Sequence, residues 1–273
     1  MMDIPLFSKD WMPIMNSYTD FASAYDELMS NVDYEKIADF MKQILLEHGI
    51  SEGILLDLAC GTGSLAEIFA GYGYEVIGVD GSFDMLSEAM NKKILSGQDI
   101  VYLCQDMQEL DLYGTVDAAV CTLDSLNHVN DLSTVQKILN RVSLFLNPGG
   151  IFIFDVNTVY KHQHVLGNNT FVYDCADVYC VWQNTLEEEN RIKIHLDIFE
   201  QSDGSYHRYE EEFCETAYSD SVIQKLLNHA GMTVTACYDD CTKSLPGEKT
   251  QRVVYVAKKT DREGMLKTKD GIS

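Results

Sequence analysis

Hydrophobic and polar positions repeat with different periods along the chain, and each change of period marks a predicted element. Nearly unbroken apolar runs occur at 54–58, 74–79, 100–104, 116–120 and 151–156. Such runs are typical of parallel strands that are covered on both faces. Apolar residues with helical spacing occur before and between them, at 20–30, 34–48, 64–70, 82–95 and 132–146. This alternation predicts an α/β fold built on a doubly wound parallel sheet.

Between 157 and 217 the apolar residues recur at every second position, which is the period of a half-buried strand. Turn residues interrupt this pattern at 167–169, 187–190 and 203–204. We therefore expect an antiparallel sheet of about four strands, inserted after the fifth parallel strand. An insertion at the carboxyl edge of a doubly wound sheet covers the ligand site, so the segment is predicted to be a substrate lid. Its aromatic residues are candidates for a pocket wall or for a small core of the lid itself: Tyr173, Tyr179, Trp182, Tyr206 and Tyr209.

After the insertion the pattern returns to a helix, at 219–230, and to two strands, at 232–238 and 251–257. The predicted domains are a core formed by 1–156 and 218–260, the inserted sheet at 157–217, and a polar tail at 261–273. Residues 1–16 of the core are expected to form a loose arm.

A glycine turn follows the first apolar strand and precedes a helix. Gly61 and Gly63 allow the backbone to turn sharply and to approach a ligand without a Cβ in the way. Asp80 ends the next strand, where an acid accepts hydrogen bonds from the ribose hydroxyls of an adenosine cofactor. The same pattern fits a nicotinamide-dependent oxidoreductase, which remains an alternative, although no Tyr-x-x-x-Lys type catalytic pair is recognisable.

Several segments together resemble the class I S-adenosylmethionine (SAM)-dependent methyltransferases. These segments are Asp57-Leu-Ala-Cys-Gly-Thr-Gly63, Val76-Ile-Gly-Val-Asp80, Gln105-Asp106-Met107, Asp124-Ser-Leu-Asn127 and the N-terminal Tyr18-x-x-Phe-Ala-x-x-Tyr25. The chain is most similar to a group of small, mostly uncharacterised bacterial methyltransferases of firmicutes that share the inserted sheet. The resemblance implies a Rossmann-like doubly wound sheet of seven strands, the last one antiparallel, with SAM as cofactor.

The resemblance also implies which residues bind SAM. Asp80 would accept from the ribose hydroxyls, and Asp106 from the adenine amino group. Several of these roles have a structural alternative. Asp106 could cap a helix, Met85 could be a core residue, and Tyr18 and Tyr25 could pack on the inner face of the N-terminal helix without contacting SAM. The full set implied is Tyr18, Tyr25, Asp57, Ala59, Cys60, Gly61, Gly63, Asp80, Gly81, Met85, Gln105, Asp106, Met107 and Thr122.

Candidate catalytic residues follow the fourth parallel strand. Asp124 and Asn127 would orient the acceptor, and His128 would take its proton. The alternative is that 124–127 cap a helix and hold the loop by local bonds. Arg252 either reaches an anionic group of the acceptor or forms a surface ion pair. No metal site is predicted, because His162 and His164 lack a third ligand.

The composition limits which binding partners and which cellular compartment are expected. Asp and Glu number 43 against 20 Lys and Arg, a formal charge of −23, which disfavours nucleic acid and anionic membranes and favours a small-molecule acceptor. The eight cysteines include no Cys-x-x-Cys pair, so we expect small buried apolar residues in a reducing cytoplasm. No apolar run is long enough for a membrane span. The prediction is a SAM-dependent methyltransferase, with a non-catalytic SAM-binding protein as a further alternative.

Overall fold

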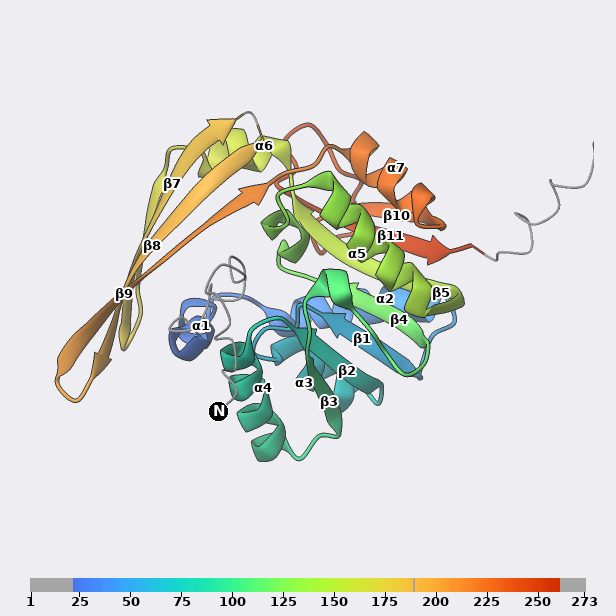
Figure 1. Cartoon of the computed structure of the whole chain (residues 1–273), viewed down its shortest axis with the longest axis horizontal. Helices are drawn as coiled ribbons and strands as arrows, with labels where there is room; N and C mark the ends of the chain where they lie inside the picture. The colour runs from blue at the N-terminus through green and yellow to red at the C-terminus, as the bar shows by residue number, and fades with distance from the viewer. Residues whose placement is uncertain (1–21, 189, 261–273) are drawn as a thin grey trace, which may run out of the picture.

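The computed structural model describes residues 22–188 and 190–260. The predicted arm, the polar tail and Tyr18 lie outside this part. Two sheets organise the described chain, one of seven strands and one of four (Figure 1). The large sheet has the order β10-β11-β5-β4-β1-β2-β3. Its strands are β1 (Ile54–Leu58), β2 (Glu75–Asp80), β3 (Ile100–Cys104), β4 (Val116–Cys121), β5 (Leu146–Asn157), β10 (Met232–Asp239) and β11 (Arg252–Lys259).

The large sheet is parallel except for its last strand, as the resemblance implies. β1 pairs in parallel with both β2 and β4, whereas β11 is antiparallel to β5 and to β10. The chain order reverses between β1 and β4. Because ligands of doubly wound sheets bind beyond the carboxyl ends of the strands at such a switch point, this edge is where a site is expected.

Helices cover both faces of the large sheet. One core packs α5 (Leu132–Phe145) and α7 (Asp220–His229) against one face, and the other packs α2 (Tyr34–Glu47) and α3 (Ser64–Gly71) against the opposite face. Neighbouring residues such as Leu55 and Leu56 enter different cores and are both fully buried. Double coverage explains the unbroken apolar runs, since both faces of each strand must be hydrophobic. None of the helices between residues 22 and 260 has the length and apolar character needed to traverse a bilayer.

The inserted sheet has four antiparallel strands, as predicted. They are β6 (Thr170–Asp174), β7 (Val178–Glu188), β8 (Arg191–Ser202) and β9 (Ser205–Thr216). The predicted turns at 187–190 and 203–204 lie between β7 and β8 and between β8 and β9, whereas the predicted turn at 167–169 precedes β6 and the turn at 175–177 between β6 and β7 was not predicted. Figure 1 shows this sheet as a curved blade that extends from the core, with α1 (Ala22–Leu28) between it and α4 (Phe83–Ser96). Its inner face, which includes Ile192 and Ile194, forms one cluster with α1 and with Met85 of α4.

The aromatic residues of the inserted sheet divide between its two faces. Tyr173, Trp182 and Tyr209 pack on the inner cluster. Tyr179 and Tyr206 are 39% and 62% exposed, and the strand register places them on the outer face. For these two residues the predicted lid core is wrong, and a role in a pocket wall stays a prediction.

Two local predictions also need correction. Residues 159–166 are helical rather than extended: α6 (Val159–Lys161) is followed by a π-helical turn at His162–Leu166. The hydroxyl of Thr158 caps α6 by accepting from the amide of Lys161 at 3.1 Å. β5 begins at Leu146, immediately after α5, and the register between β4 and β5 shifts between Val116 and Ala118.

The cysteines are less buried than expected. All eight are free, but only Cys121 and Cys180 are fully buried. Cys104 is exposed, and the other five are half-buried.

Candidate functional site

The glycine turn after β1 leaves open space at one of its two glycines. Gly61 and Gly63 both adopt left-handed φ angles, 54° and 76°. A Cβ added at Gly63 would lie 2.3 Å from the Tyr102 hydroxyl, so this glycine permits close packing of α3. A Cβ at Gly61 would meet nothing within 4 Å. The turn is therefore packed on one side and open on the other, which is the geometry expected of a cofactor cradle.

Asp80 fixes this turn against the end of β2. One carboxylate oxygen accepts from the amide of Gly61 and the other from the amide of Ser82, each at 2.8 Å. An ionised carboxylate has about four lone-pair positions, so two remain for the hydroxyls of a ribose. Burial raises the pKa of Asp80, and the backbone donors oppose that effect.

Asp57, within β1, lies beneath the turn and is 1% exposed. Burial and the neighbouring Asp80 raise its pKa from 3.8 to about 7. One of its oxygens has no hydrogen-bond partner within the described structure. Direct contact between Asp57 and a cofactor stays a prediction.

The segment after β3 is held by its own side chains. Asp106 caps the 3₁₀ turn at Met107–Glu109: its carboxylate accepts from the amide of Gln108 at 2.9 Å and from the side-chain amide of Gln108 at 3.2 Å. The side chain of Gln105 bonds both backbone groups of Asp111. Asp106 therefore has the capping role that was its alternative, and the contact of Asp106 with adenine stays a prediction. Met85, 3% exposed, packs in the cluster of α1 and the inserted sheet, and its contact with adenine stays a prediction.

The N-terminal helix α1 is tied to the glycine turn. Asp26 accepts from the hydroxyl of Thr62 at 2.6 Å and pairs with Lys92 of α4, also at 2.6 Å. Burial raises the pKa of Tyr25 well above its usual range, and nearby Tyr34, Asp124 and Asp80 add to that shift. Tyr25 therefore lies near Asp80, the predicted ribose acceptor, and near Asp124, a candidate catalytic residue.

Asp124 is at the centre of a buried network beyond β4. It accepts from Arg252 of β11 at 2.6 Å and from the Asn157 side chain at 2.8 Å. Burial alone would raise the pKa of Asp124, but the charges of Arg252 and Lys161 outweigh it and lower this pKa to about 2. Arg252 also pairs with Asp155, and the expected surface ion pair is thus wrong: the guanidinium is largely buried between two acids.

Asn127 has a structural role, but through bonds to residues distant in sequence and not through the local bonds of the predicted alternative. Its side chain is fully buried and donates to the carbonyls of Asn157 at 3.2 Å and Thr216 at 3.0 Å. Its carbonyl oxygen accepts from the amide of Asn157 at 2.9 Å. Asn127 therefore holds together the two ends of the inserted segment, and these backbone bonds occupy its amide.

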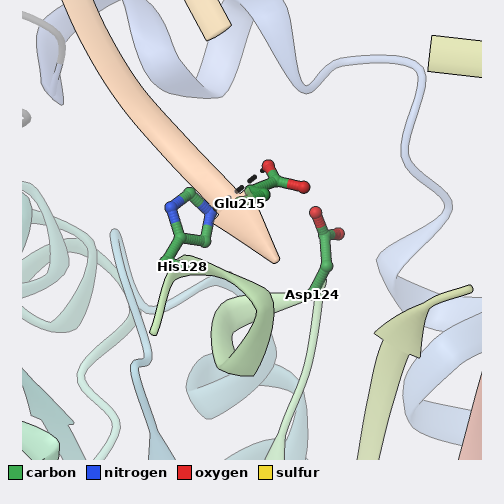
Figure 2. Close-up of side chains that lie close together, drawn as sticks. All are labelled: Asp124, His128 and Glu215. Carbon is green, nitrogen blue, oxygen red and sulfur yellow. Dashed lines mark ion pairs between the residues drawn. The ribbon is translucent and has the colours of Figure 1, made fainter. Parts of the chain in front are cut away.

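His128 lies beside a residue that sequence reasoning missed. Figure 2 shows His128 and Asp124 on the turn after β4, facing Glu215 near the end of β9. The Nε2 atom of His128 is 3.8 Å from one oxygen of Glu215, and its ring packs on Phe213 at 4.9 Å between centroids. The side chain of Glu215 is only 5% exposed. Strand alternation was the available signal, because it places this acid on the inner face of the sheet.

Comparisons with known proteins point to one family. A family model described as a methyltransferase domain matches residues 55–150. The chain is 33% identical over 245 residues to YqeM of Bacillus subtilis (strain 168), a protein named as a methyltransferase, covering 89% of this chain and 97% of that one. A solved SAM-dependent methyltransferase from Clostridium acetobutylicum superposes with a TM-score of 0.82 at 35% identity, covering 89% of this chain and 99% of that one.

A more distant structure shares the fold. The SAM-bound amino pentose methyltransferase CalS10 of Micromonospora echinaspora has a TM-score of 0.70 at 18% identity and covers 95% of this chain and all of its own length, 100%. The open glycine turn, the acid at the end of β2 and the antiparallel last strand agree with these similarities. The chain therefore belongs to the class I SAM-dependent methyltransferases and uses SAM as its cofactor.

Proposed function

We propose that this chain transfers the methyl group of SAM to a small-molecule acceptor held between the turn after β4 and the inner face of the inserted sheet. The contact of His128 with Glu215 carries this proposal. It joins the carboxyl edge of the large sheet, where the cofactor of this family binds, to a strand of the predicted lid. Residues 157–217 would then form the wall of the acceptor site opposite the cofactor.

The turn after β1 fits the cofactor. Gly61 leaves room beside the main chain, and Asp80 retains acceptor capacity for the ribose. Asp106 is proposed for the adenine, in addition to its capping bond. When bound, SAM supplies a methyl group on a sulfonium, which is already a good leaving centre. The chain then has to align the nucleophile and exclude water.

A small molecule, and specifically an amine, is the acceptor class we favour. The net charge of −23 opposes the binding of nucleic acid. A relative from Halorhodospira halochloris, 26% identical over 255 residues and covered to 90% in both chains, is named glycine/sarcosine N-methyltransferase. These similarities also favour methyl transfer over the nicotinamide chemistry that the glycine turn alone would allow.

The proposed roles at the acceptor divide between two side chains. Asp124, kept ionised by Arg252, accepts a hydrogen bond from the acceptor and orients it. His128, whose side chain is 29% exposed, takes the proton of the nucleophile. A SAM-binding protein without activity would need neither role.

The test is an activity panel on the full chain. Purified protein is incubated with SAM and with small amines, amino acids and phenols, and transfer RNA and a protein serve as large comparators. We expect release of S-adenosylhomocysteine with a small amine, and a loss of at least about tenfold in His128→Ala. His229→Ala, an exposed histidine on α7, is the matched control. Turnover with only the large comparators, or unchanged turnover in His128→Ala, would overturn the proposal.

A further inference from the structure

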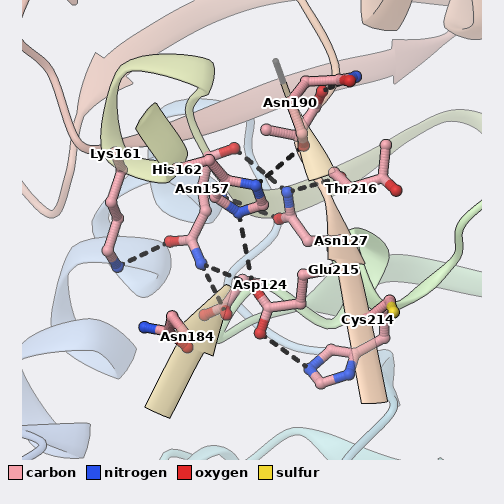
Figure 3. Close-up of polar contacts among 12 residues, drawn as sticks. Asp124, Asn127, Asn157, Lys161, His162, Asn184, Asn190, Cys214, Glu215 and Thr216 are labelled. Atoms are coloured by element: carbon pink, nitrogen blue, oxygen red, sulfur yellow. Dashed lines mark hydrogen bonds and ion pairs between the residues drawn. The ribbon is translucent and has the colours of Figure 1, made fainter. Parts of the chain in front are cut away.

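Glu215 is surrounded by three polar side chains from separate elements. One oxygen faces Nε2 of His128 at 3.8 Å. The other lies 3.5 Å from Nε2 of His162 and accepts from the side chain of Asn157 at 3.3 Å. Figure 3 shows the ring of His162 beside this carboxylate, and Figure 2 shows His128 facing the same carboxylate. His162, in the π-helical turn, is 0% exposed, so water does not reach its ring.

The hydrogen bonds of His162 determine where its proton lies. Its Nδ1 atom is 3.0 Å from the carbonyl oxygen of Asn190. A carbonyl only accepts, so Nδ1 must carry the hydrogen. In a neutral ring, Nε2 would then present a lone pair to the carboxylate of Glu215. Two acceptors facing each other in a buried site are unfavourable, and Nε2 has no hydrogen-bond partner in the described structure.

The charges of the network indicate a single missing positive charge. The linked carboxylates are Asp124, Asp155 and Glu215, and the linked cations are Arg252 and Lys161. Three negative charges against two positive charges leave one negative charge, which one proton neutralises. Buried charges are costly unless they are balanced, so the network favours one additional proton. Burial raises the pKa of Asp155, but Arg252 and two backbone amides already donate to that carboxylate, whereas Nε2 of His162 faces an acceptor.

A divalent cation fits the same place less well. Asp124, His128 and Glu215 bring one ligand atom each within 4.8 Å of one another. However, the carboxylate of Asp124 already pairs with Arg252, so a divalent ion bound there would lie beside a buried guanidinium. A divalent ion would also change the balance of the network from one negative to one positive charge beside two buried cations.

We propose that His162 and Glu215 share one buried proton, which fixes Glu215 as the positioning residue for His128. This inference rests on the proposed function and deepens it, because it specifies an acceptor whose nucleophile carries a proton. The acceptor nitrogen forms its bond to the methyl carbon as the methyl–sulfur bond breaks, and S-adenosylhomocysteine leaves. The N–H proton of the acceptor passes to the imidazole of His128, and the imidazolium is stabilised by the carboxylate of Glu215.

The test follows the ring nitrogens of His162 directly. Full-length protein with ¹⁵N-labelled histidine and bound SAM is examined by long-range ¹H–¹⁵N correlation at neutral pH. We expect Nε2 of His162 to be protonated in the wild type. In Glu215→Gln the side-chain amide donates to Nε2, so His162 becomes neutral with its hydrogen on Nδ1. Glu212→Gln, an exposed position on the same strand that pairs with Lys193, is the control and leaves the ring unchanged.

Two results would overturn the inference. One is an unprotonated Nε2 in the wild-type ring, a measurement that needs no variant to fold. The other is saturable binding of zinc or magnesium to the wild type that Glu215→Gln abolishes. Neither measurement requires methyl transfer. If the activity panel rejects the proposed function, the spectra still show whether Nε2 of His162 carries a proton.

Kinetics with an amine found in the panel separate positioning from folding. We expect Glu215→Gln to lower kcat at least about tenfold, with the affinity for SAM changed less than about twofold. Glu215→Asp should recover part of kcat, because it restores the charge. Equal losses in kcat and in SAM affinity would show a merely structural role and overturn the proposal.

Discussion

Arg252, on the last strand of the sheet, donates a hydrogen bond at 2.6 Å to Asp124, which lies 128 positions earlier on the turn after β4. The same guanidinium pairs with Asp155 on β5, whose carboxylate accepts from the amides of Leu123 and Asp124 at 2.8 Å each. The left-handed backbone at Leu123 and Asp124 is held in place by these bonds. The antiparallel strand β11 thus fixes the turn that carries the candidate catalytic residues.

Removing the guanidinium should destabilise the fold strongly. In Arg252→Met, Asp124 and Asp155 remain buried without their partner, and breaking such a pair costs about 3–5 kcal/mol. Urea unfolding followed by circular dichroism measures this loss. Arg208→Met is the control: Arg208 pairs with Asp197 in the exposed part of the inserted sheet, and about 1 kcal/mol or less is expected. Similar losses in both variants would contradict the buried network.

Asp57 should make the fold less stable as the pH rises. Its pKa of about 7 in the folded chain exceeds the ordinary 3.8, so the folded state holds this proton more tightly. The free energy of unfolding therefore falls between about pH 4 and about pH 7 through this group, and the penalty is complete above that range. Urea unfolding at about pH 5 and about pH 8 should show a smaller difference in Asp57→Asn than in the wild type. The exposed Asp99→Asn should behave like the wild type.

The two glycines of the turn should respond differently to alanine. Gly61→Ala has open space for the methyl group but a left-handed φ of 54°, so we expect a stability loss of about 1–2 kcal/mol. Because the methyl group enters the cradle, SAM affinity should fall at least about tenfold. Gly204→Ala, in an open turn of the inserted sheet with φ 77°, is the control with similar strain and unchanged SAM affinity.

Gly63→Ala should instead affect folding. Its Cβ would lie 2.3 Å from the Tyr102 hydroxyl, and that hydroxyl has no hydrogen-bond partner in the described structure. Tyr102→Phe should therefore restore part of the stability lost in Gly63→Ala, as thermal unfolding can measure. No recovery in the double variant would show that the backbone angle, and not the contact, is decisive.

Asp80→Ala should weaken the binding of SAM by tenfold or more. The substitution removes the proposed ribose acceptor and also the anchor of the Gly61 amide. Titration calorimetry measures the affinity directly. Glu75→Ala, at the exposed start of the same strand, should bind as the wild type does. An unchanged affinity in Asp80→Ala would reject the assignment.

Elements with a strong local pattern were predictable from the sequence. The parallel strands are buried on both faces, and short apolar runs bounded by turns are typical of such strands. The inserted sheet alternates because only its inner face is covered, as Ile192 and Ile194 show. The helical segment at 159–166 was not predicted, because α6 is short and its start is marked only by the capping residue Thr158.

The acceptor site was harder to predict because its contacts are distant in sequence. From the sequence alone, Arg252 has the appearance of a surface charge. In the structure β11 lies between β5 and β10, and this position places Arg252 beside Asp124. Glu215 follows a run of three glutamates, Glu210 to Glu212, and strand alternation places both it and Glu211 on the inner face, so this pattern alone does not single it out. Its burial beside His128 depends on pairing between β8 and β9 and on the docking of the sheet, which a single sequence does not encode locally.

A crystal structure with S-adenosylhomocysteine bound would show where the cofactor lies on the large sheet. We expect that the ribose hydroxyls contact Asp80, that the sugar lies against the main chain at Gly61, and that the sulfur faces the space between Asp124, His128 and Glu215. A sulfur atom directed away from these three side chains, or a ligand bound away from the glycine turn, would contradict this expectation.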